Sequence, residues 1–347
     1  MSFVRRLYQG TTAVDFRPMW RRSIPISAAL VVISLALLGL RGLELSIDFD
    51  GGGVWEVPVA DDVSVADGRA AVPGLEDARI QLVEDPSLGN LIRVQSGTED
   101  IGRSPEIVAG LAELGGVTVD DVSVSTVGPT WGSQITDKAV RALVLFFIAV
   151  AAYLAFALEW RMAVGALVAV VHDLLITAGV YSLLAFEVSP ATIIALLTIL
   201  GYSLYDTVVV YDKVRENQGT TVGDGVSHTE LINRSMNQVL MRSINTTITT
   251  VLPVASMLIV GGIFLGGDAL QGFALALFIG LILGTYSSIF VAAPVLAWLK
   301  EREPESDEDR RRRLRAAEVF GDESAEVPVD EVRTVGVQAR PRKKKRR

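Results

Sequence analysis

Long apolar stretches divide this chain, and each is long enough to cross a lipid bilayer as a helix. They lie at about residues 23–40, 139–158, 162–185, 190–211, 244–263 and 272–299. A helix rises about 1.5 Å per residue, so roughly 20 apolar residues span the hydrocarbon core. Half of all residues are hydrophobic, which fits a membrane protein better than a soluble enzyme of this length. The sequence therefore predicts a polytopic α-helical membrane protein with six transmembrane helices.

Basic residues indicate which end of each predicted helix faces the cytoplasm. They cluster in residues 1–22 and beside the inner ends of the apolar stretches, whereas the short loops 186–189 and 265–271 carry none. Because Lys and Arg are retained on the cytoplasmic side, this bias predicts that both termini are cytoplasmic. The first stretch can also be interpreted as a signal peptide. Its long basic leader and the lack of a small-x-small cleavage site favour an uncleaved helix at residues 23–40.

Residues 41–138 differ from the rest of the chain. Apolar and polar residues alternate there, with Gly, Pro and Asp between the alternating runs. The pattern predicts strands at about 43–49, 54–59, 78–84, 91–96 and 118–127, and helices at about 62–72 and 104–115. Ser104 is expected to cap the second helix, with Pro105 at its first position. After the first strand, the order strand–helix–strand–strand–helix–strand indicates a ferredoxin-like α+β domain. Because it follows one helix from a cytoplasmic start, this domain is expected to be extracytoplasmic.

The remaining segments carry fewer features that indicate chemistry. Residues 139–299 hold the other five helices, and residues 300–347 form a charged tail, predicted to be disordered, with Lys343 to Arg347 at its end. Such a basic block can bind anionic lipid, a ribosome or nucleic acid, or can be a plain solvated tail. The chain has no cysteine and two histidines, His172 and His228. The sequence therefore indicates neither a disulfide nor a metal site, and no cofactor is expected.

An aspartate inside the fourth apolar stretch is the strongest candidate for a functional site. Asp206 belongs to GYSLYDTVVVYDKVREN at residues 201–217, and lies roughly 9 Å along a helix from Asp212. Placing a carboxylate in hydrocarbon is costly, so such a residue is by default a proton or ion carrier, or one member of a buried pair. The alternative is an aspartate at a helix end that only pairs structurally or reaches the membrane surface.

The fifth stretch offers a partner of opposite charge and a polar stripe. Arg242, Thr246, Thr249 and Thr250 share one helical face, at a depth comparable to that of Asp206. If the two faces meet, Arg242 favours the ionised carboxylate while the apolar surroundings favour the neutral one, and such opposed effects suit a proton carrier. Hydroxyl packing between helices explains the stripe equally well.

The third stretch contains a second acid, Asp173, which strengthens the interpretation as a proton relay. Asp173 shares a helical face with Thr177, one turn further on. His172 precedes it directly. Because adjacent residues of a helix point about 100° apart, the two are not expected to act as a pair, and His172 is interpreted as structural.

Glycines mark two joints of the expected outer domain and the packing face of the last helix. Residues 47–53 read IDFDGGG, with Asp48, Gly51 and Gly52, and residues 127–132 read VGPTWG, with Gly128, Pro129 and Gly132. Glycine permits unusual backbone angles and close packing at such joints. In the last stretch Gly280, Gly284 and Ser288 form a row of small residues that lets another helix approach. No GxGxxG or Walker pattern is present, so neither a nucleotide site nor an enzymatic activity is expected.

Together these motifs resemble those of SecF, the family of the smaller membrane subunit of the bacterial SecDF accessory complex of protein export. The resemblance rests on IDFDGG at 47–52, VGPTWG at 127–132, the stretch beginning at Gly201, INRSMNQVLMRSINTTITT at 232–250 and GTYSSIFVAAPVL at 284–296, in this order. It implies the architecture of the resistance–nodulation–division superfamily: one helix, an outer domain, then five helices.

The resemblance also implies a function. A SecF-like chain would pair with SecD in the bacterial cell membrane, work beside the SecYEG channel, and use the proton motive force to promote late, ATP-independent export of preproteins. Asp206 and Arg242 match the family's transmembrane Asp and Arg, which implies roles in proton flow. Family members usually carry Asn where this chain has Tyr205. Asn can donate through its NH₂ to a carboxylate, whereas Tyr offers one O–H, so the detail of proton coupling is in question.

Two other functions fit the same residues. A half-transporter of the superfamily would export a lipid or a small molecule, and would need a larger outer region with an apolar pocket than residues 41–138 supply. A structural scaffold would use Asp206 and Arg242 only to fix helix packing. Replacing such a pair by residues that pack well can be neutral, which separates a scaffold from a proton carrier.

Overall fold

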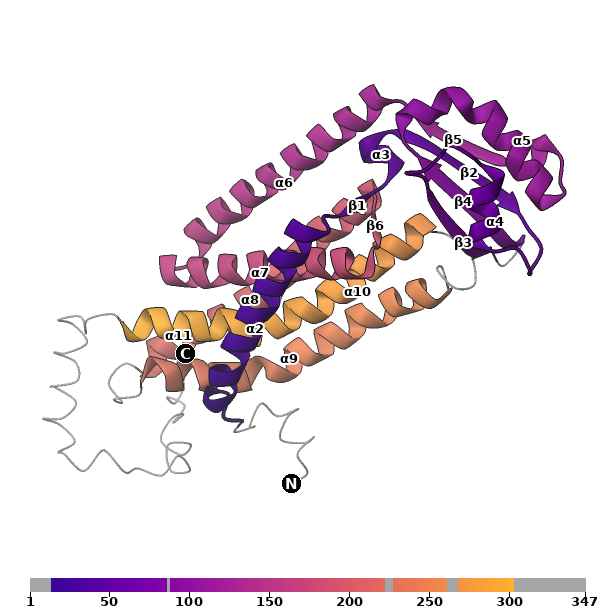
Figure 1. Ribbon diagram of the computed structural model, residues 1–347. Coiled ribbons are helices and arrows are strands. Elements are labelled where there is room, and N and C mark those ends of the chain that lie inside the picture. Colours follow the sequence, from indigo (N-terminus) through magenta and orange to yellow (C-terminus); the bar gives the residue numbers. More distant parts are fainter. Residues whose placement is uncertain (1–13, 86–87, 222–226, 261–267, 303–347) are drawn as a thin grey trace, which may run out of the picture.

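The computed structural model describes residues 14–85, 88–221, 227–260 and 268–302 (Figure 1). Within them, six helices are long and apolar enough to cross a membrane, as the sequence predicts. They are α2 (Arg17–Leu40), α6 (Pro129–Ala157), α7 (Trp160–Leu184), α8 (Pro190–Thr221), α9 (His228–Met257), and α10 (Asp268–Ser287) continued by α11 (Ala293–Glu301). The predicted disorder of the charged tail and its basic end fall outside the described residues.

Two of these helices begin well before the apolar stretch that predicts them. Pro129 is the first residue of α6, and its fixed φ suits the start of a helix. Its lack of a backbone N–H costs nothing there, because the first N–H groups of a helix have no partner within the helix. The α9 helix begins at His228, because the Ser227 hydroxyl accepts a hydrogen bond from the backbone N–H of Glu230 at 3.2 Å and caps it. The apolar pattern thus marks the part of a helix suited to lipid, whereas the caps mark where the helix starts.

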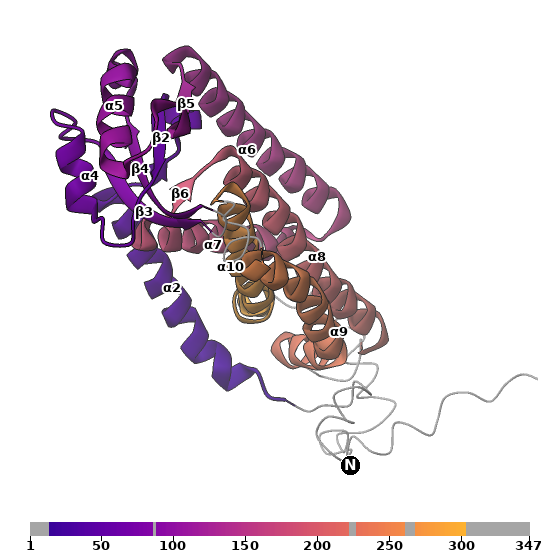
Figure 2. The same cartoon turned by 90° about the vertical axis from the view of Figure 1, so that its right-hand side faces the viewer.

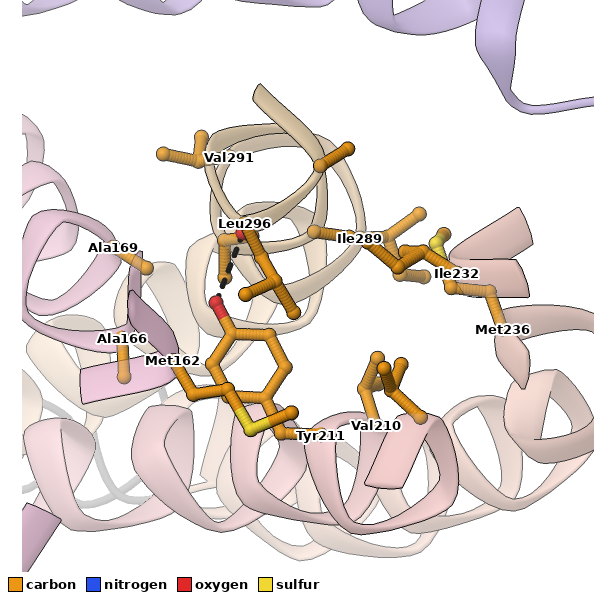
Figure 3. Close-up of a cluster of buried hydrophobic side chains, with 14 of the residues drawn as sticks. Met162, Ala166, Ala169, Val210, Tyr211, Ile232, Met236, Ile289, Val291 and Leu296 are labelled. Atoms are coloured by element: carbon orange, nitrogen blue, oxygen red, sulfur yellow. Dashed lines mark hydrogen bonds between the residues drawn. The ribbon is translucent and has the colours of Figure 1, made fainter. Parts of the chain in front are cut away.

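The centre of the bundle consists of α7, α8 and the α10–α11 helix. Buried residues make up 56%, 44% and 50% of the most apolar window of these helices, against 17%, 6% and 6% for α2, α6 and α9. The latter three are therefore the helices left to face lipid or a partner, and α2 and α6 lie on opposite flanks in Figure 2. Tyr211 of α8 fills the centre together with Met162 and Leu296 (Figure 3).

A π-helical turn, Ser288–Ala292, interrupts the last helix between α10 and α11. Its backbone carbonyls accept three hydrogen bonds from other helices: from Trp20 Nε1 to Ile289 at 3.1 Å, from Ser23 Oγ to Phe290 at 3.3 Å, and from the Tyr211 hydroxyl to Ala292 at 2.9 Å. A π turn disturbs the regular hydrogen-bond ladder of a helix. The donors from α2 and α8 therefore stabilise it.

A four-stranded antiparallel sheet, in the order β3-β4-β2-β5, lies between α2 and α6 in the chain. Its elements, in chain order, are β2 (Gly52–Pro58), α4 (Val65–Ala71), β3 (Arg79–Asp85), β4 (Gly89–Ser96), α5 (Ser104–Gly115) and β5 (Ser123–Val127). Both helices pack on one face of the sheet (Figure 2), over a core that contains the fully buried Trp55, Ile92 and Leu111.

The predicted first strand at 43–49 is wrong beyond its first residues. β1 (Glu44–Leu45) is followed by a helical turn, α3 (Ile47–Asp50), rather than by more strand. The turn ends at Gly51 and Gly52, whose φ angles are 76° and 135°. A strand of alternating side chains cannot continue through such angles, which favour glycine.

Two other boundaries in the domain differ from the sequence pattern. Ser104 is the first residue of α5 rather than its cap, because its hydroxyl instead accepts a hydrogen bond from Trp55 Nε1 at 2.8 Å. The last strand does not begin at residue 118, because Thr118 and Asp121 close a capping box around a short 3₁₀ turn. The Thr118 hydroxyl bonded to Asp121 also holds the pKa of that carboxyl below its usual range.

A short parallel pair joins the base of this domain to the helices. β1 pairs with β6 (Glu187–Val188), which lies in the loop between α7 and α8. Arg79 of β3 lies 3.3 Å from the Glu44 carboxylate and donates to the carbonyl of Ala185 at 3.0 Å. The domain is thus attached to the pair of helices that carry Asp173 and Asp206.

Candidate functional site

Asp206 lies inside the bundle, on the side of α8 that meets α9. It is 8% exposed, and its Oδ1 accepts a hydrogen bond from the Ser243 hydroxyl at 2.7 Å. Its Oδ2 is buried and has no hydrogen-bond partner among the described residues. A buried polar atom without a partner is uncommon and needs an explanation, such as a catalytic or transport role or an unseen water.

A small cavity lies against this carboxylate. Ten residues of α8, α9 and α10 line it: Tyr202, Ser203, Tyr205, Asp206, Thr246, Thr247, Thr250, Leu281, Gly284 and Thr285. Its volume, about 20 Å³ of space for the centre of a water molecule, is enough for roughly one water. Most of the lining surface is apolar, but seven of the lining residues carry a hydroxyl and Asp206 carries a carboxylate, so a water there has polar partners within the lining.

Arg242 lies beside this site but does not form the direct ion pair with Asp206 that the sequence suggests. The described residues show no ion pair between the two; Arg242 Nη2 donates to the Tyr205 hydroxyl at 2.9 Å, and its guanidinium lies 5.9 Å from the centre of that ring. Successive residues on a helix diverge by about 100°. Asp206 and Ser243 therefore face inward, while Tyr205 and Arg242 meet on the exposed side of the same helix contact.

The threonine stripe of α9 divides in two. Thr246 and Thr250 line the cavity, whereas Thr249 is exposed and donates to the Asn245 carbonyl of its own helix at 2.8 Å. Thr246 and Thr250 also donate to carbonyls one turn back, at 2.9 and 2.7 Å, which leaves their oxygens able to accept. Only part of the predicted stripe therefore reaches the site.

Asp173 is fully buried at the centre of the bundle, and its carboxylate joins three side chains. Its Oδ2 accepts from Ser203 of α8 at 2.6 Å and from Ser287 of α10 at 2.7 Å. Its Oδ1 lies 3.0 Å from His172 Nδ1. The expectation that His172 and Asp173 do not pair is thus wrong, because the imidazole turns back toward its neighbour even though the two Cβ atoms point apart.

Sequence reasoning missed the serines that bind the two acids. Ser203, Ser243 and Ser287 lie in apolar spans, where small hydroxyl residues usually signal only helix packing. Hydroxyl contacts between the same helices continue the polar core, from Thr207 to Ser288 at 2.8 Å and from Thr247 to Thr285 at 2.7 Å. Only Ser203 shares a helix with one of the two acids, so the sequence carries no signal that links Ser243 or Ser287 to its acid.

The glycine motifs lie at two different places. At the domain end of the bundle (Figure 1), a Cβ on Gly132 of α6 would lie 2.6 Å from the Phe49 carbonyl of α3, so glycine is required there. Gly284 permits α10 to approach α8, since its Cβ would lie 3.0 Å from that of Ser203. Neither space nor backbone angle requires glycine at Gly128 or Gly201.

Asp48 also belongs to the domain end and takes no part in the buried polar core. Its carboxylate accepts a hydrogen bond from the Ser46 hydroxyl at 3.3 Å. Within the described parts of the chain, no group of three His, Cys, Asp or Glu side chains is placed to hold a metal ion. The groups gathered at Asp206 and Asp173 are carboxylates, hydroxyls and an imidazole, which are groups that can transfer protons.

The fold and its polar core define a class: multi-pass membrane proteins with a mixed α/β domain after the first helix and two carboxylates buried among the others. Residues 108–302 match the family model described as protein export membrane protein SecD/SecF, C-terminal. A protein translocase subunit SecF from Streptomyces coelicolor is 42% identical over 94% of this chain and 88% of its own. One from Mycobacterium tuberculosis is 40% identical over 87% of this chain and 70% of its own.

A solved structure is also similar. The crystal structure of SecDF, a translocon-associated membrane protein from Thermus thermophilus, matches with a TM-score of 0.74 and 34% identity over 84% of this chain. The present chain spans 39% of the length of that SecDF chain. Sequence and structure agree, and the chain belongs to the SecF family.

Proposed function

We propose that this chain is an accessory subunit of the Sec protein translocase that, with SecD, uses the proton motive force to promote late, ATP-independent steps of protein export. In this proposal Asp206 takes up and releases the proton. Arg242 sets the local potential beside it, and Thr246 and Thr250 border the cavity through which the proton arrives. Thr249 lies between them in the chain but faces the exposed side of α9, so it has no part in the cavity. The chain acts as a transport subunit and not as an enzyme.

The observation that carries the proposal is that the buried Oδ2 of Asp206 has no hydrogen-bond partner among the described residues, while a cavity the size of about one water lies against the same side chain. A carboxylate with a free acceptor, inside a helix apolar enough to cross a membrane, costs free energy that helix packing alone does not recover. A water in the cavity can bring a proton to that oxygen and remove it again. Asp173 differs, because both of its oxygens have hydrogen-bond partners.

The domain between α2 and α6 is, in this proposal, a ferredoxin-like extracytoplasmic domain. Its element order and its sheet order β3-β4-β2-β5 are those expected for that fold. Placing it outside the cell puts both termini in the cytoplasm, which agrees with the basic residues near α2 and in the loops at the opposite end of the bundle. The emerging preprotein would be engaged by this domain.

The proposed partners follow from the helices that are little buried. Few residues in the apolar windows of α2, α6 and α9 are buried, and α9 also exposes Arg242 and Thr249. The SecDF chain extends well beyond the part matched here, which supports SecD as the partner of this bundle. We further propose the SecYEG channel as neighbour, protons and preproteins as the transported species, and anionic lipid as a ligand of the basic residues 343–347.

The test is protein export into inverted membrane vesicles under an imposed proton gradient. Asp206→Asn keeps the size and hydrogen bonding of the side chain but cannot exchange a proton. We expect it to abolish the gradient-dependent part of export while the SecD complex still assembles at matched membrane levels. A gene deletion strain carrying the native chain provides the reference.

Two outcomes would contradict the proposal. Unchanged gradient-dependent export in Asp206→Asn would leave a scaffold whose acid is structural. Normal preprotein export in a strain lacking this chain, together with a defect in the export of a lipid or small molecule, would favour the half-transporter.

A further inference from the structure

His172 is a second buried titratable group, and the function proposed above gives it no role. It is 4% exposed, and its Nδ1 lies 3.0 Å from Asp173 Oδ1. Its Nε2 is buried and has no hydrogen-bond partner in the described part of the chain. The described residues hold two side chains with such an orphaned atom, Asp206 and His172, and both lie in the bundle that carries the polar core. An imidazole kept only for packing has no reason to leave a polar nitrogen unpaired.

Among the described residues, no Lys or Arg side chain is bonded to this histidine or to Asp173. The titratable groups recorded against it are Asp173, by hydrogen bond, and Tyr286 of α10, whose ring stacks on the imidazole with centres 6.2 Å apart. The Tyr286 hydroxyl is itself engaged with Ser27 of α2 at 3.0 Å. The recorded partners of Asp173 are two hydroxyls and this imidazole. With Asp173 ionised, the pair carries one net negative charge in an apolar interior.

One added proton removes that charge. The pair becomes neutral overall whether the proton rests on the carboxylate or on the imidazole, and a neutral pair is favoured in a medium of low dielectric constant. Because the two groups share a hydrogen bond, their protonation belongs to the pair and not to either residue. The pair is therefore built to hold one proton or none.

Ser203 connects this pair to the Asp206 cavity. Its hydroxyl donates to Asp173 Oδ2 at 2.6 Å, and the same residue lines the cavity that Asp206 borders. A hydroxyl can accept a proton on one side while it donates its own on the other. A single side chain thus separates the pair from the water-sized space beside Asp206.

We propose that His172 and Asp173 form a second proton-exchanging site that is filled from the Asp206 cavity through Ser203. Asp206 gives its proton to a water in the cavity, the water gives a proton to Ser203 Oγ, and the original Ser203 proton passes to Asp173 Oδ2. One O–H bond breaks and one forms at each step. Asp206 ends as the anion, and the His172–Asp173 pair ends neutral. This inference rests on the proposed function, because it extends the same proton path by one site.

The chain's two histidines allow a direct test that does not depend on export. The full-length chain, labelled with ¹⁵N-histidine, purified through a histidine-free tag and placed in lipid nanodiscs, should give two imidazole spin systems. His228 is exposed at the start of α9, so His228→Asn identifies the signals of His172. We expect the chemical shifts of the His172 ring nitrogens to change when the pH is varied over the range in which the chain stays folded. We also expect Asp206→Asn to alter that change.

Ring signals of His172 that stay constant over this range would overturn the proposal, whatever the export assay shows. A pH response that is identical in the native chain and in Asp206→Asn would overturn the connection between the two sites.

Export under a proton gradient gives a second readout. His172→Asn keeps a nitrogen near the position of Nδ1, so it preserves the bond to Asp173 but cannot take up a proton. Ser203→Ala removes the connecting hydroxyl. Ser182→Ala is the matched control, since Ser182 is also buried and its hydroxyl binds the backbone of Leu37, away from both acids. We expect the first two variants to lose most of the gradient-dependent export, and the control to keep it.

The variants separate the two proposals. Loss in Asp206→Asn with full activity in His172→Asn would overturn the second site and leave the proposed function standing. Full activity in Asp206→Asn would overturn the proposed function, and the ring titration would then decide alone whether His172 exchanges a proton.

Discussion

Two aspartates on neighbouring helices of one bundle have opposite surroundings. Asp173 on α7 is fully buried, and its two oxygens contact His172, Ser203 and Ser287. Asp206 on α8 is 8% exposed, has one bond from Ser243, and keeps its other oxygen free beside a cavity. Both are acids in apolar helices, so their sequences alone do not distinguish them.

This difference in hydrogen bonding shows how two carboxylates in one bundle can have different properties. A carboxylate whose oxygens are all bonded is held in one geometry and joins the helices that donate to it. A carboxylate with a spare acceptor next to water can exchange a proton without breaking the bundle. The bonds from Ser203 and Ser287 therefore tie α8 and α10 to Asp173; in the path that we propose, Asp206 is the point of proton entry and Asp173 belongs to the inner site.

The largest effect that we expect is on the free energy of unfolding when each of the two aspartates is replaced by alanine. Asp173→Ala leaves two hydroxyls and an imidazole without their partner, and each buried group left unpaired costs about 1–3 kcal/mol. We therefore expect a loss of roughly 3 kcal/mol or more in the free energy of unfolding, against about 1 kcal/mol for Asp206→Ala, which removes one hydrogen bond. Thermal unfolding of the two purified variants in detergent measures the difference. Equal losses of unfolding free energy in Asp173→Ala and Asp206→Ala would contradict the view that Asp173, and not Asp206, holds the helices together.

A smaller effect is expected when the helices are pushed apart at the cavity. Gly284→Ala brings a methyl group to 3.0 Å from the Cβ of Ser203, a contact tight enough to displace it. Overpacking of this kind costs about 1–3 kcal/mol. Gly201→Ala is the control, because a methyl group there meets open space and alanine stabilises a helix by about 1 kcal/mol relative to glycine. Opposite signs in thermal unfolding support the close approach of α8 and α10, and like signs contradict it.

Removing the bond to Asp206 should have an effect of about 1–2 kcal/mol. In Ser243→Ala the buried carboxylate loses its recorded hydrogen bond, which in proteins contributes about that much. Thr249→Ala on the same helix should stay within about 0.5 kcal/mol, because Thr249 is exposed. If both substitutions cost the same, the Ser243 contact does not hold Asp206 in place.

The smallest effect is expected on the exposed side of the same helix contact. Tyr205→Phe removes the hydroxyl that accepts from Arg242, and an exposed contact of this kind contributes about 0–1 kcal/mol. Tyr202→Phe is matched to it in exposure, at 46% against 48%. Thermal unfolding should not distinguish the two variants. A clear loss in Tyr205→Phe alone would mean that this tyrosine positions Arg242 and takes over the role expected of asparagine.

Much of the architecture can be predicted from local pattern, because apolar length and alternation are local properties. The six helices follow from the apolar stretches, and the strands at β2, β3 and β4 follow from alternation. The strand predicted at 43–49 is wrong after Leu45, because residues 47–50 form a helical turn that leads into the positive φ angles of Gly51 and Gly52, and the alternating pattern does not predict that turn.

The site could be predicted only in part. The depth of Asp206 and Arg242 along their helices is readable, but the rotation of each helix about its axis is not. That rotation turns Arg242 to Tyr205 and Ser243 to Asp206. The donors to Asp173 come from positions 30 and 114 residues away in the chain, which no spacing rule connects.

The π-helical turn Ser288–Ala292 fixes the rotation of the last helix about its own axis. Donors from α2 and α8 reach three of its carbonyls, and one rotational setting of the helix satisfies all three. In that setting Ser287 points to Asp173 and Ser288 to Thr207. A slip of one residue would break these contacts together and withdraw a donor from the aspartate. The rotational setting of the last helix thus determines how many hydrogen bonds the centre of the bundle can donate to Asp173.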